Sequence, residues 1–367
     1  MKPSIAELRA AYAGKRVLLT GHTGFKGGWL ALWLAELGAE VTGFALAPET
    51  SPALFDAVGV ERTCRHILGD LRDRERLRAA VREARPDFVF HLAAQALVRR
   101  SYAEPLETLE TNVLGTAALL ETLRQEQRPC AVVVVTSDKC YENREWSWGY
   151  REDDPMGGHD VYSMSKGAAE LVTSSYRRSF FPPDRLEQHG VAVATVRAGN
   201  VIGGGDWSKD RLVPDIVRSL AAGEPVGIRN PRSVRPWQHV LEPLGGYLVL
   251  GAALASADAR QYCEAWNFGP RTEDAEPVSR LVEQMIELWG AGRWVDWSEP
   301  SAPHEAGVLR LSIDKAFAKL GWQPRWNVRE ALQQTVTWYR AHLSGASADE
   351  LRALCIAQIR AYGEARR

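Results

Sequence analysis

Apolar and polar residues alternate regularly over the first two hundred positions, where short β-branched runs are followed by longer helical patterns. Such alternation predicts an α/β fold, with a parallel sheet covered by helices on both faces. The predicted helices span residues 26–38, 73–84 and 107–127. The predicted strands span residues 16–20, 40–46, a run that ends at Asp70, and residues 87–94, 131–137 and 191–200.

The carboxyl ends of parallel strands meet at one edge of a sheet, and ligands bind at that edge. Residues that close predicted strands should therefore lie together. These residues are Thr20, Asp70, His91, Thr136 and Arg197.

The amino-acid composition of the chain changes after Asn200. Residues 203–215 and 228–240 are rich in Gly, Pro, Arg and Trp, which is typical of functional loops around short elements. We expect residues 1–200, with a returning segment near 237–268, to form a dinucleotide-binding domain. Residues 201–236 and 269–367 are expected to form a smaller, mainly C-terminal ligand-binding lobe.

A glycine-rich turn joins the first strand to the first helix. Gly21, Gly24 and Gly27 have the spacing G-x-x-G-x-x-G, within a segment that also holds Thr23, Phe25 and Lys26. Residues without a Cβ let backbone amides and a helix N-terminus approach a diphosphate. A tight turn without a ligand is the alternative. The strand before it and the helix after it favour dinucleotide binding and a Rossmann-like, doubly wound sheet.

The end of the second strand indicates which dinucleotide binds. The segment FALAPET, residues 44–50, supplies no Asp for a ribose hydroxyl and no Arg or Lys for a 2'-phosphate, so we favour NAD over NADP. Asp70 and Leu71 close the third strand, where the Asp70 carboxylate could accept a hydrogen bond from adenine. The alternative role, a helix N-cap, can be filled by Asp73.

Two pairs of residues carry candidate chemistry. Tyr162 and Lys166 are four apart, so on a helix they share one face, and an ammonium group beside a phenol favours the phenolate that a general base requires. Asp138 and Lys139 come directly after the run of four valines, Thr136 and Ser137. A solvated surface pair is the alternative in both cases.

The glycine turn, Asp70-Leu71, Thr136 and Tyr162/Lys166 occur in an order that resembles the extended short-chain dehydrogenase/reductases. This resemblance covers essentially the whole chain. The longer motifs GHTGFKGGWL, TSDKCYEN, GNVIGGGDW and RPWQHVLEPLGGYL resemble those of CDP-glucose 4,6-dehydratases.

The resemblance implies that bound NAD oxidises the sugar at C4, with Thr136 at the C4 oxygen, Tyr162 taking the proton and Lys166 holding Tyr162 and the ribose. An acid and a base then remove water across C5 and C6, and hydride returns to C6. Asp138 is the preferred acid and Lys139 the preferred base, although the roles could be exchanged. Related dehydratases carry an Asp-Glu pair directly after the Thr. This chain has Thr-Ser-Asp-Lys instead, with one extra residue before Tyr141.

The resemblance also implies ligand contacts outside this centre. Ala93 and Ala94 are expected close to the cofactor. Substrate contacts are expected from Gln95, Asn200, Arg211, Val213, Arg235, His304 and Arg310. Forked guanidinium groups suit the diphosphate of a CDP-glucose substrate. A homodimer or homotetramer is expected, formed through helices near 107–127 and 161–178.

Net charge and the numbers of cysteine and histidine bear on the expected partners, disulfides and metals. The net charge of −1 gives no reason to expect nucleic acid or membrane partners. Five widely spaced cysteines and eight histidines without ligand spacing argue against a disulfide framework or a metal site, and they are typical of a cytoplasmic protein. A 4-epimerase of the same fold, a dehydratase for another nucleotide-sugar and a catalytically silent dinucleotide-binding regulator remain the alternatives.

Overall fold

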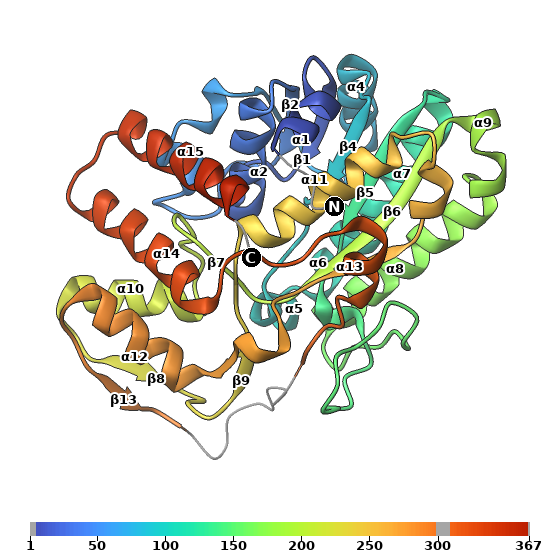
Figure 1. Ribbon diagram of the computed structural model, residues 1–367. Helices are drawn as coiled ribbons and strands as arrows, with labels where there is room; N and C mark the ends of the chain where they lie inside the picture. The colour runs from blue at the N-terminus through green and yellow to red at the C-terminus, as the bar shows by residue number, and fades with distance from the viewer. Residues whose placement is uncertain (1–4, 299–308, 366–367) are drawn as a thin grey trace.

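The β-branched runs of the sequence pair side by side in a seven-stranded parallel sheet, in the order β11-β6-β5-β4-β1-β2-β3 (Figure 1). The computed structural model describes residues 5–298 and 309–365. The strands are β1 (Arg16–Thr20), β2 (Glu40–Ala45), β3 (Arg65–Leu68), β4 (Phe88–His91), β5 (Cys130–Val135), β6 (Val191–Ala198) and β11 (Ala265–Phe268). The predicted α/β class and doubly wound sheet are confirmed, and the strand order reverses between β1 and β4, where such folds bind dinucleotides.

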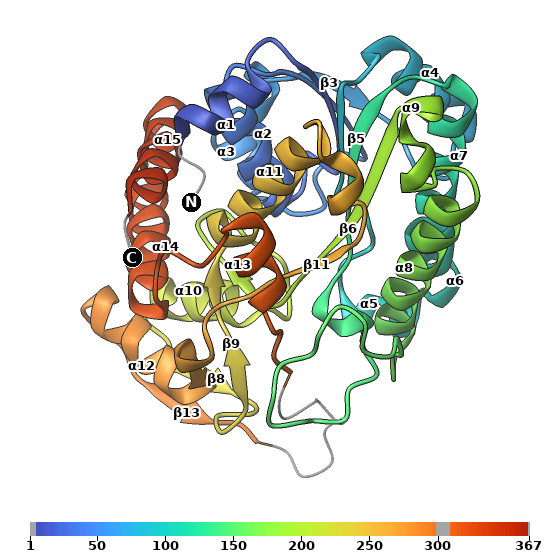
Figure 2. The same ribbon diagram turned by 45° about the vertical axis from the view of Figure 1, so that its right-hand side comes forward.

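Helices cover both faces of the sheet, as Figure 2 shows for β5 and β6. The first face carries α1 (Ile5–Tyr12), α2 (Phe25–Glu36) and α11 (Leu241–Leu254), and the second carries α4 (Arg74–Ala84), α7 (Gly115–Glu126) and α8 (Val161–Ser179). Strand β5 contributes to both cores, because successive side chains point to opposite faces. Val133 and Val135 pack with the first group, and Val132 and Val134 with the second.

Residues 105–126 are helical throughout, which confirms the helix predicted over residues 107–127, but this helix is not uniformly α-helical. The chain forms α6 (Pro105–Leu109), a π-helical turn η2 (Glu110–Leu114) and then α7. This turn directs Asn112 inward, where its side-chain amide donates to the Gln95 carbonyl at 3.0 Å and to Ser165 Oγ at 2.9 Å. A π turn leaves no mark on hydrophobic periodicity at this length, so the sequence pattern could not show it.

Apart from α11 and β11, many of the residues after Asn200 form short strands and helices beside the sheet, at the lower left of Figure 1. Strand β8 (Val226–Ile228) pairs with β13 (Trp294–Asp296), and β9 (Val234–Pro236) pairs with β12 (Ala275–Pro277). The flanking helices are α10 (Leu212–Ala222), α12 (Val278–Trp289), α14 (Val328–Leu343) and α15 (Ala348–Glu364). Helix α15 returns to pack on α2.

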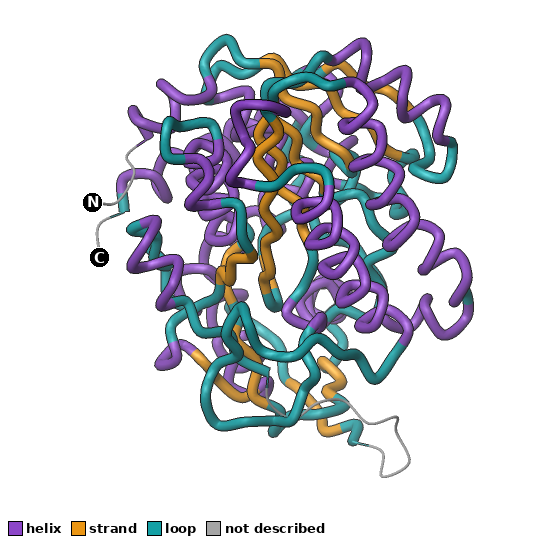
Figure 3. Tube along the Cα trace, turned by 90° about the vertical axis from the view of Figure 1, so that its right-hand side faces the viewer, coloured by secondary structure: helices purple, strands orange, loops and turns teal. Residues whose placement is uncertain are grey.

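Short elements complete the described chain, and Figure 3 shows the strands running through the middle with helices on either side. Residues 247–254 form the second half of α11. The remaining elements are α3 (Leu54–Ala57), α5 (Val98–Ala103), α9 (Leu186–His189), α13 (Asp314–Leu320), the 3-10 turns η1 (Val60–Arg62), η3 (Asp138–Cys140), η4 (Pro183–Arg185), η5 (Ala259–Tyr262) and η6 (Thr272–Asp274), and the paired β7 (Val201–Ile202) and β10 (Gln238–His239).

Candidate active site

The glycine turn between β1 and α2 is packed too closely for side chains. Gly21 has a φ of +80°, and a Cβ there would lie 2.7 Å from the Ala93 nitrogen. A Cβ on Gly27 would lie 2.0 Å from the Gly21 carbonyl oxygen. Gly24 caps α2 without a side-chain hydrogen bond, which leaves the helix N-terminus open to an anion. The residues present therefore fit the diphosphate of a dinucleotide.

The other predicted residues of this turn face in different directions. Thr23 Oγ1 donates to the Leu46 carbonyl at 2.9 Å and so fixes the turn to the end of β2. Phe25 packs near Gly203. Burial and the charge of Arg211 lower the pKa of Lys26 to about 8, which places this ammonium group inside the site.

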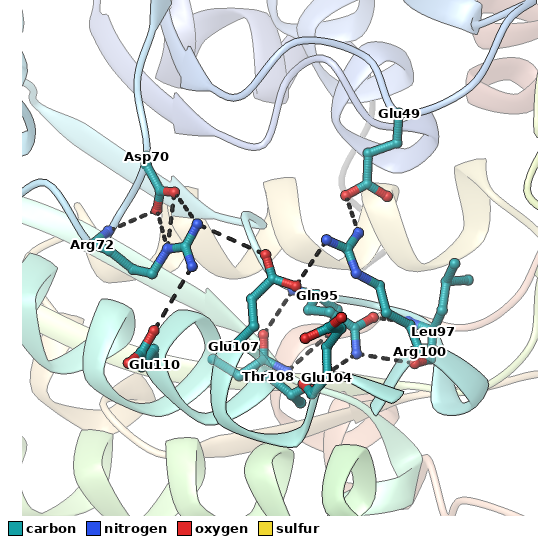
Figure 4. Close-up of polar contacts among 11 residues, drawn as sticks. Glu49, Asp70, Arg72, Gln95, Leu97, Arg100, Glu104, Glu107, Thr108 and Glu110 are labelled. Carbon is teal, nitrogen blue, oxygen red and sulfur yellow. Dashed lines mark hydrogen bonds and ion pairs between the residues drawn. The ribbon is translucent and has the colours of Figure 1, made fainter. Parts of the chain in front are cut away.

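At the end of β3, Asp70 already has a cationic partner, as Figure 4 shows. Its carboxylate accepts from the Arg72 backbone N–H at 2.9 Å and from the Arg72 guanidinium at 2.6 Å. This guanidinium holds the pKa of Asp70 below its ordinary value. A carboxylate accepts several hydrogen bonds, so Asp70 can still receive one from adenine. The neighbouring Leu71 is buried against Gly115.

The contacts of Arg72 continue into a surface ion-pair network (Figure 4). Arg72 lies 3.7 Å from Glu107, and Glu107 also binds Arg100 at 2.9 Å. Arg100 in turn binds Glu49, beyond the end of β2, at 2.8 Å. The network joins the ends of β2 and β3 to α5 and α6.

The side chain of Gln95 forms hydrogen bonds within the protein, mainly to its own loop. Its side-chain amide donates to the Leu97 carbonyl at 3.0 Å and to Thr108 Oγ1 at 2.9 Å, and its oxygen accepts from the Leu97 N–H. These bonds use both of its N–H groups within the protein. The predicted contact of Gln95 with the sugar stays a prediction. Ala93 and Ala94 come just before it, and Ala93 donates to Thr20 Oγ1 at 3.1 Å.

Tyr162 and Lys166 lie in the first two turns of α8, whose N-terminus is capped by Asp160. Burial raises the pKa of Tyr162 to about 12, while a hydrogen bond with the Ser137 side chain opposes that rise. Burial lowers the pKa of Lys166 to about 8. The ammonium nitrogens of Lys166 and Lys139 lie 5.9 and 6.0 Å from the centre of the Tyr162 ring. Both lysines thus flank Tyr162.

The side chains of the neighbouring residues Thr136 and Ser137 have different partners in the structure. By the alternation of β5, Thr136 continues the face of Val132 and Val134, which is covered by α8. Its hydroxyl donates to Glu170 Oε1 at 2.5 Å and to the Val196 carbonyl at 3.2 Å. The side chain hydrogen-bonded to Tyr162 is that of Ser137, which the sequence analysis did not select. The direction of the strand pleat was the signal that could have found it.

Asp138 and Lys139 lie in the turn η3, directly after Ser137. Burial raises the pKa of Asp138 against the opposing effects of Lys139, a hydrogen bond from Ser137 at 2.9 Å, and Lys26. A Cβ on Gly199 would lie 2.9 Å from Asp138 Oδ2, so a glycine at the end of β6 leaves room for this carboxyl group. Gly199 is a second residue that the sequence analysis missed.

Two of the predicted substrate residues surround this centre. Asn200 follows Gly199 at the end of β6. Arg211 caps α10 and binds Asp206 at 2.9 Å, and its charge lowers the pKa of Tyr162, so it lies near the phenol. The structure therefore brings Lys26, Asp138, Lys139, Tyr162, Lys166 and Arg211 together.

The other predicted substrate residues are more scattered. Val213 is buried in α10, and Arg235 lies in β9 opposite Glu276 of β12. The Arg310 carbonyl accepts from the Tyr150 N–H at 2.8 Å, and no described contact joins Arg310 to the residues around Tyr162. His304 lies outside the described residues.

Across residues 5–298 and 309–365, no group of three or more His, Cys, Asp or Glu side chains is arranged to hold a metal ion. Within the same ranges, no helix combines the length and apolar character that crossing a bilayer requires.

Comparison with known proteins shows the family. Residues 18–249 match the family model described as GDP-mannose 4,6 dehydratase. A CDP-glucose 4,6-dehydratase of Salmonella typhimurium is 56% identical over 335 residues, which cover 91% of this chain and 93% of that protein. A dTDP-glucose 4,6-dehydratase of Streptomyces antibioticus is 31% identical over 75% of this chain and 76% of that protein.

Solved structures agree with this assignment. A dTDP-glucose 4,6-dehydratase of Streptomyces venezuelae, with NAD and TYD bound, has a TM-score of 0.74 at 26% identity and covers 90% of this chain and 98% of that chain. A UDP-glucose 4-epimerase of Thermus thermophilus in complex with NAD has a TM-score of 0.75 at 27% identity over 90% of this chain and 99% of that chain. The chain belongs to the nucleotide-sugar 4,6-dehydratase family, within the extended short-chain dehydrogenase/reductases.

Proposed function

We propose that this protein converts CDP-D-glucose to CDP-4-keto-6-deoxy-D-glucose, as a hydro-lyase that recycles NAD. The observation that carries the proposal is the turn Ser137-Asp138-Lys139 beside Tyr162 and Lys166, in a chain 56% identical to a CDP-glucose 4,6-dehydratase over 91% of its length. An epimerase needs an oxidation centre at C4. A dehydratase also needs an acid and a base near C5 and C6, and Asp138 and Lys139 supply that pair.

NAD, when bound, supplies an acceptor for the C4 hydride and a donor that returns it to C6. Gly21, Gly24 and Gly27 would hold its diphosphate at the N-terminus of α2, with Thr23, Phe25 and Lys26 beside it. Asp70 and Leu71 would receive the adenine, and Ala93 and Ala94 would border the cofactor after β4. Known structures of this fold with NAD support this assignment.

We assign the oxidation at C4 to Tyr162, Lys166 and Ser137. Tyr162 takes the proton from the C4 hydroxyl, with Lys166 beside it. Ser137, rather than Thr136, donates a hydrogen bond to the C4 oxygen, because the Ser137 side chain is bonded to Tyr162 and the Thr136 hydroxyl is turned to Glu170.

The elimination step falls to Asp138 and Lys139. Burial raises the pKa of Asp138. A raised pKa suits the acid that protonates the departing C6 hydroxyl. Lys139 is then the base at C5.

Asn200, Arg211, Val213 and Arg235 are proposed to bind the nucleotide-sugar. Arg211 stands nearest the centre, and its fork suits a phosphate oxygen. Gln95, His304 and Arg310 are also proposed to contact the nucleotide-sugar. The division at residues 200, 237 and 268 into two ligand-binding parts is supported by β11, which returns from the later chain to pair with β6.

Assembly and location are also proposed. Exposed Leu106, Leu114, Met164 and Leu171 lie on the stretch from α6 to η2 and on α8, which pack side by side. We propose that these helices join a homodimer or homotetramer. We further propose a cytoplasmic enzyme whose product serves deoxysugar units of cell-surface polysaccharide, such as lipopolysaccharide O-antigen.

The test is incubation of the purified protein with CDP-glucose and NAD, followed by mass spectrometry of the nucleotide-sugar. We expect loss of one water with no net NADH, and no such loss with Tyr162→Phe. Parallel incubations with dTDP-glucose, UDP-glucose and GDP-mannose test the choice of base. An unchanged mass with an epimerised sugar would establish the epimerase instead.

A further inference from the structure

A buried ion pair lies behind the candidate active site. Arg197 of β6 and Glu170 of α8 form a two-pronged pair, with Nε to Oε1 at 3.0 Å and Nη2 to Oε2 at 2.9 Å. Their side chains are only 4% and 5% exposed. Arg197 was predicted at the open edge of the sheet, whereas its guanidinium is enclosed. A buried pair that is fully hydrogen-bonded holds its partners in one arrangement.

Glu170 extends the row of catalytic side chains on α8. Tyr162, Lys166 and Glu170 are four residues apart and so lie on one face of the helix. The negative charge of Glu170 raises the pKa of Lys166 against burial. The ion pair is therefore attached rigidly to the element that carries the proposed base.

The same ion pair holds the catalytic turn at both of its ends. Before the turn, Thr136 Oγ1 donates to Glu170 Oε1 at 2.5 Å. After the turn, Arg197 Nη1 donates to the Tyr141 hydroxyl at 2.6 Å, and that hydroxyl donates to Asn267 Oδ1 at 2.8 Å. Ser137, Asp138 and Lys139 lie between these two attachments.

We infer that Thr136 and Tyr141 are positioning residues, which clamp the turn Ser137–Lys139 to the Glu170–Arg197 pair and so align it with Tyr162 and Lys166. Neither residue is required to touch the substrate in this arrangement. The effect on catalysis rests on the proposed dehydratase function, whereas the effect on the turn itself rests on the fold alone.

The chain supplies a matched control for Thr136. Thr195, in the middle of β6, donates to the other oxygen of the same carboxylate, Glu170 Oε2, at 2.7 Å. Thr136→Val and Thr195→Val each remove one hydroxyl bonded to Glu170 and keep the shape of the side chain. Only the first variant releases the catalytic turn. Thr136→Ser keeps the hydroxyl and serves as the rescue variant.

The first experiment is amide hydrogen exchange, read by mass spectrometry on peptides that cover residues 136–141. We expect Thr136→Val and Tyr141→Phe to speed exchange there about tenfold or more, while Thr195→Val and Thr136→Ser leave it within about twofold of the unsubstituted protein. Equal exchange in Thr136→Val and Thr195→Val would overturn the clamp, whatever reaction the protein catalyses.

The second experiment measures turnover of CDP-glucose with NAD in the same variants. We expect Thr136→Val and Tyr141→Phe to lower kcat about tenfold or more, with KM and the Kd for NAD within about twofold. Thr195→Val should keep kcat at a similar cost in melting temperature. A loss of kcat shared by Thr195→Val would show a purely structural role. An inactive unsubstituted protein would refute the proposed function and leave the exchange result to decide the clamp.

Discussion

Two buried glutamates, Glu170 on α8 and Glu242 on α11, lie on opposite faces of the sheet. The pKa values of their carboxyl groups are shifted in opposite directions. Burial acts to raise the pKa of Glu170, but the charge of Arg197 and the hydrogen bonds from Arg197, Thr136 and Thr195 outweigh it, so the pKa is lowered. Glu242 is fully buried as well, and there burial raises the pKa to about 7.

The partners of Glu242 explain the difference. Its oxygens accept from the Arg325 N–H at 3.0 Å, from the Trp326 N–H at 2.7 Å and from the Tyr362 hydroxyl at 2.8 Å. The Arg325 guanidinium donates to the carbonyls of Tyr362 and Gly363, and its charge has the smallest effect on the pKa of Glu242. Neutral donors at good distances offset less of the desolvation than one bidentate guanidinium does.

Asp138 resembles Glu242 rather than Glu170, because burial raises its pKa and the nearby cations only oppose the rise. We expect Asp138→Asn to lower the dehydration rate by about 10²–10⁴-fold, since a general acid is lost. NADH should accumulate when CDP-glucose is added, because oxidation at C4 survives. Full dehydration in this variant, measured by mass spectrometry, would remove Asp138 from the mechanism.

Removing the Arg197 guanidinium should make the buried Glu170 carboxylate destabilise the fold. Arg197→Met leaves a buried carboxylate without its counter-charge, so we expect the free energy of unfolding to fall by about 3–5 kcal/mol. The double variant Glu170→Gln/Arg197→Met should recover part of that loss. Urea unfolding of both variants gives the answer, and equal losses would contradict the role assigned to the pair.

Glu242 should make stability depend on pH. Its folded pKa of about 7 lies above the ordinary 4.5, so its contribution is complete below pH 4.5 and is lost as the pH rises through 7. We expect that loss to be about 3 kcal/mol, at 1.36 kcal/mol per pKa unit. Unfolding should therefore be compared between pH 5 and pH 8 in the unsubstituted protein and in Glu242→Gln. Parallel curves would show that Glu242 does not titrate in this range.

The exposed ion pairs of Arg72 should contribute least to the free energy of unfolding. Arg72 is 39% exposed and meets Asp70, Glu107 and Glu110 in water-accessible pairs. We expect Arg72→Met to change the free energy of unfolding by less than about 1 kcal/mol, because solvent screens such pairs. A loss as large as that of Arg197→Met would mean that exposure does not separate the two networks.

The sequence was sufficient for features that repeat along the chain. The alternation of strands and helices predicted the sheet, and β1 was predicted at its observed ends. Periodicity did not show which side chain at the end of β5 faces the site, because Thr136 and Ser137 differ only in the direction of the pleat. Nor did it show that Gln95 bonds within its own loop, or that α6 and α7 are separated by a π turn. These features depend on contacts between segments far apart in the chain.

The place of β11 has a consequence for the nascent protein. This strand closes one side of β6, whose eight residues are all buried, yet it is translated long after β6 itself. At roughly 5–20 residues per second, the ribosome needs several seconds to pass from residue 198 to residue 268. During that interval β6 presents an unpaired edge on which another chain could add a strand. Synthesis of residues 265–268 therefore removes a strand edge that the nascent chain would otherwise leave open.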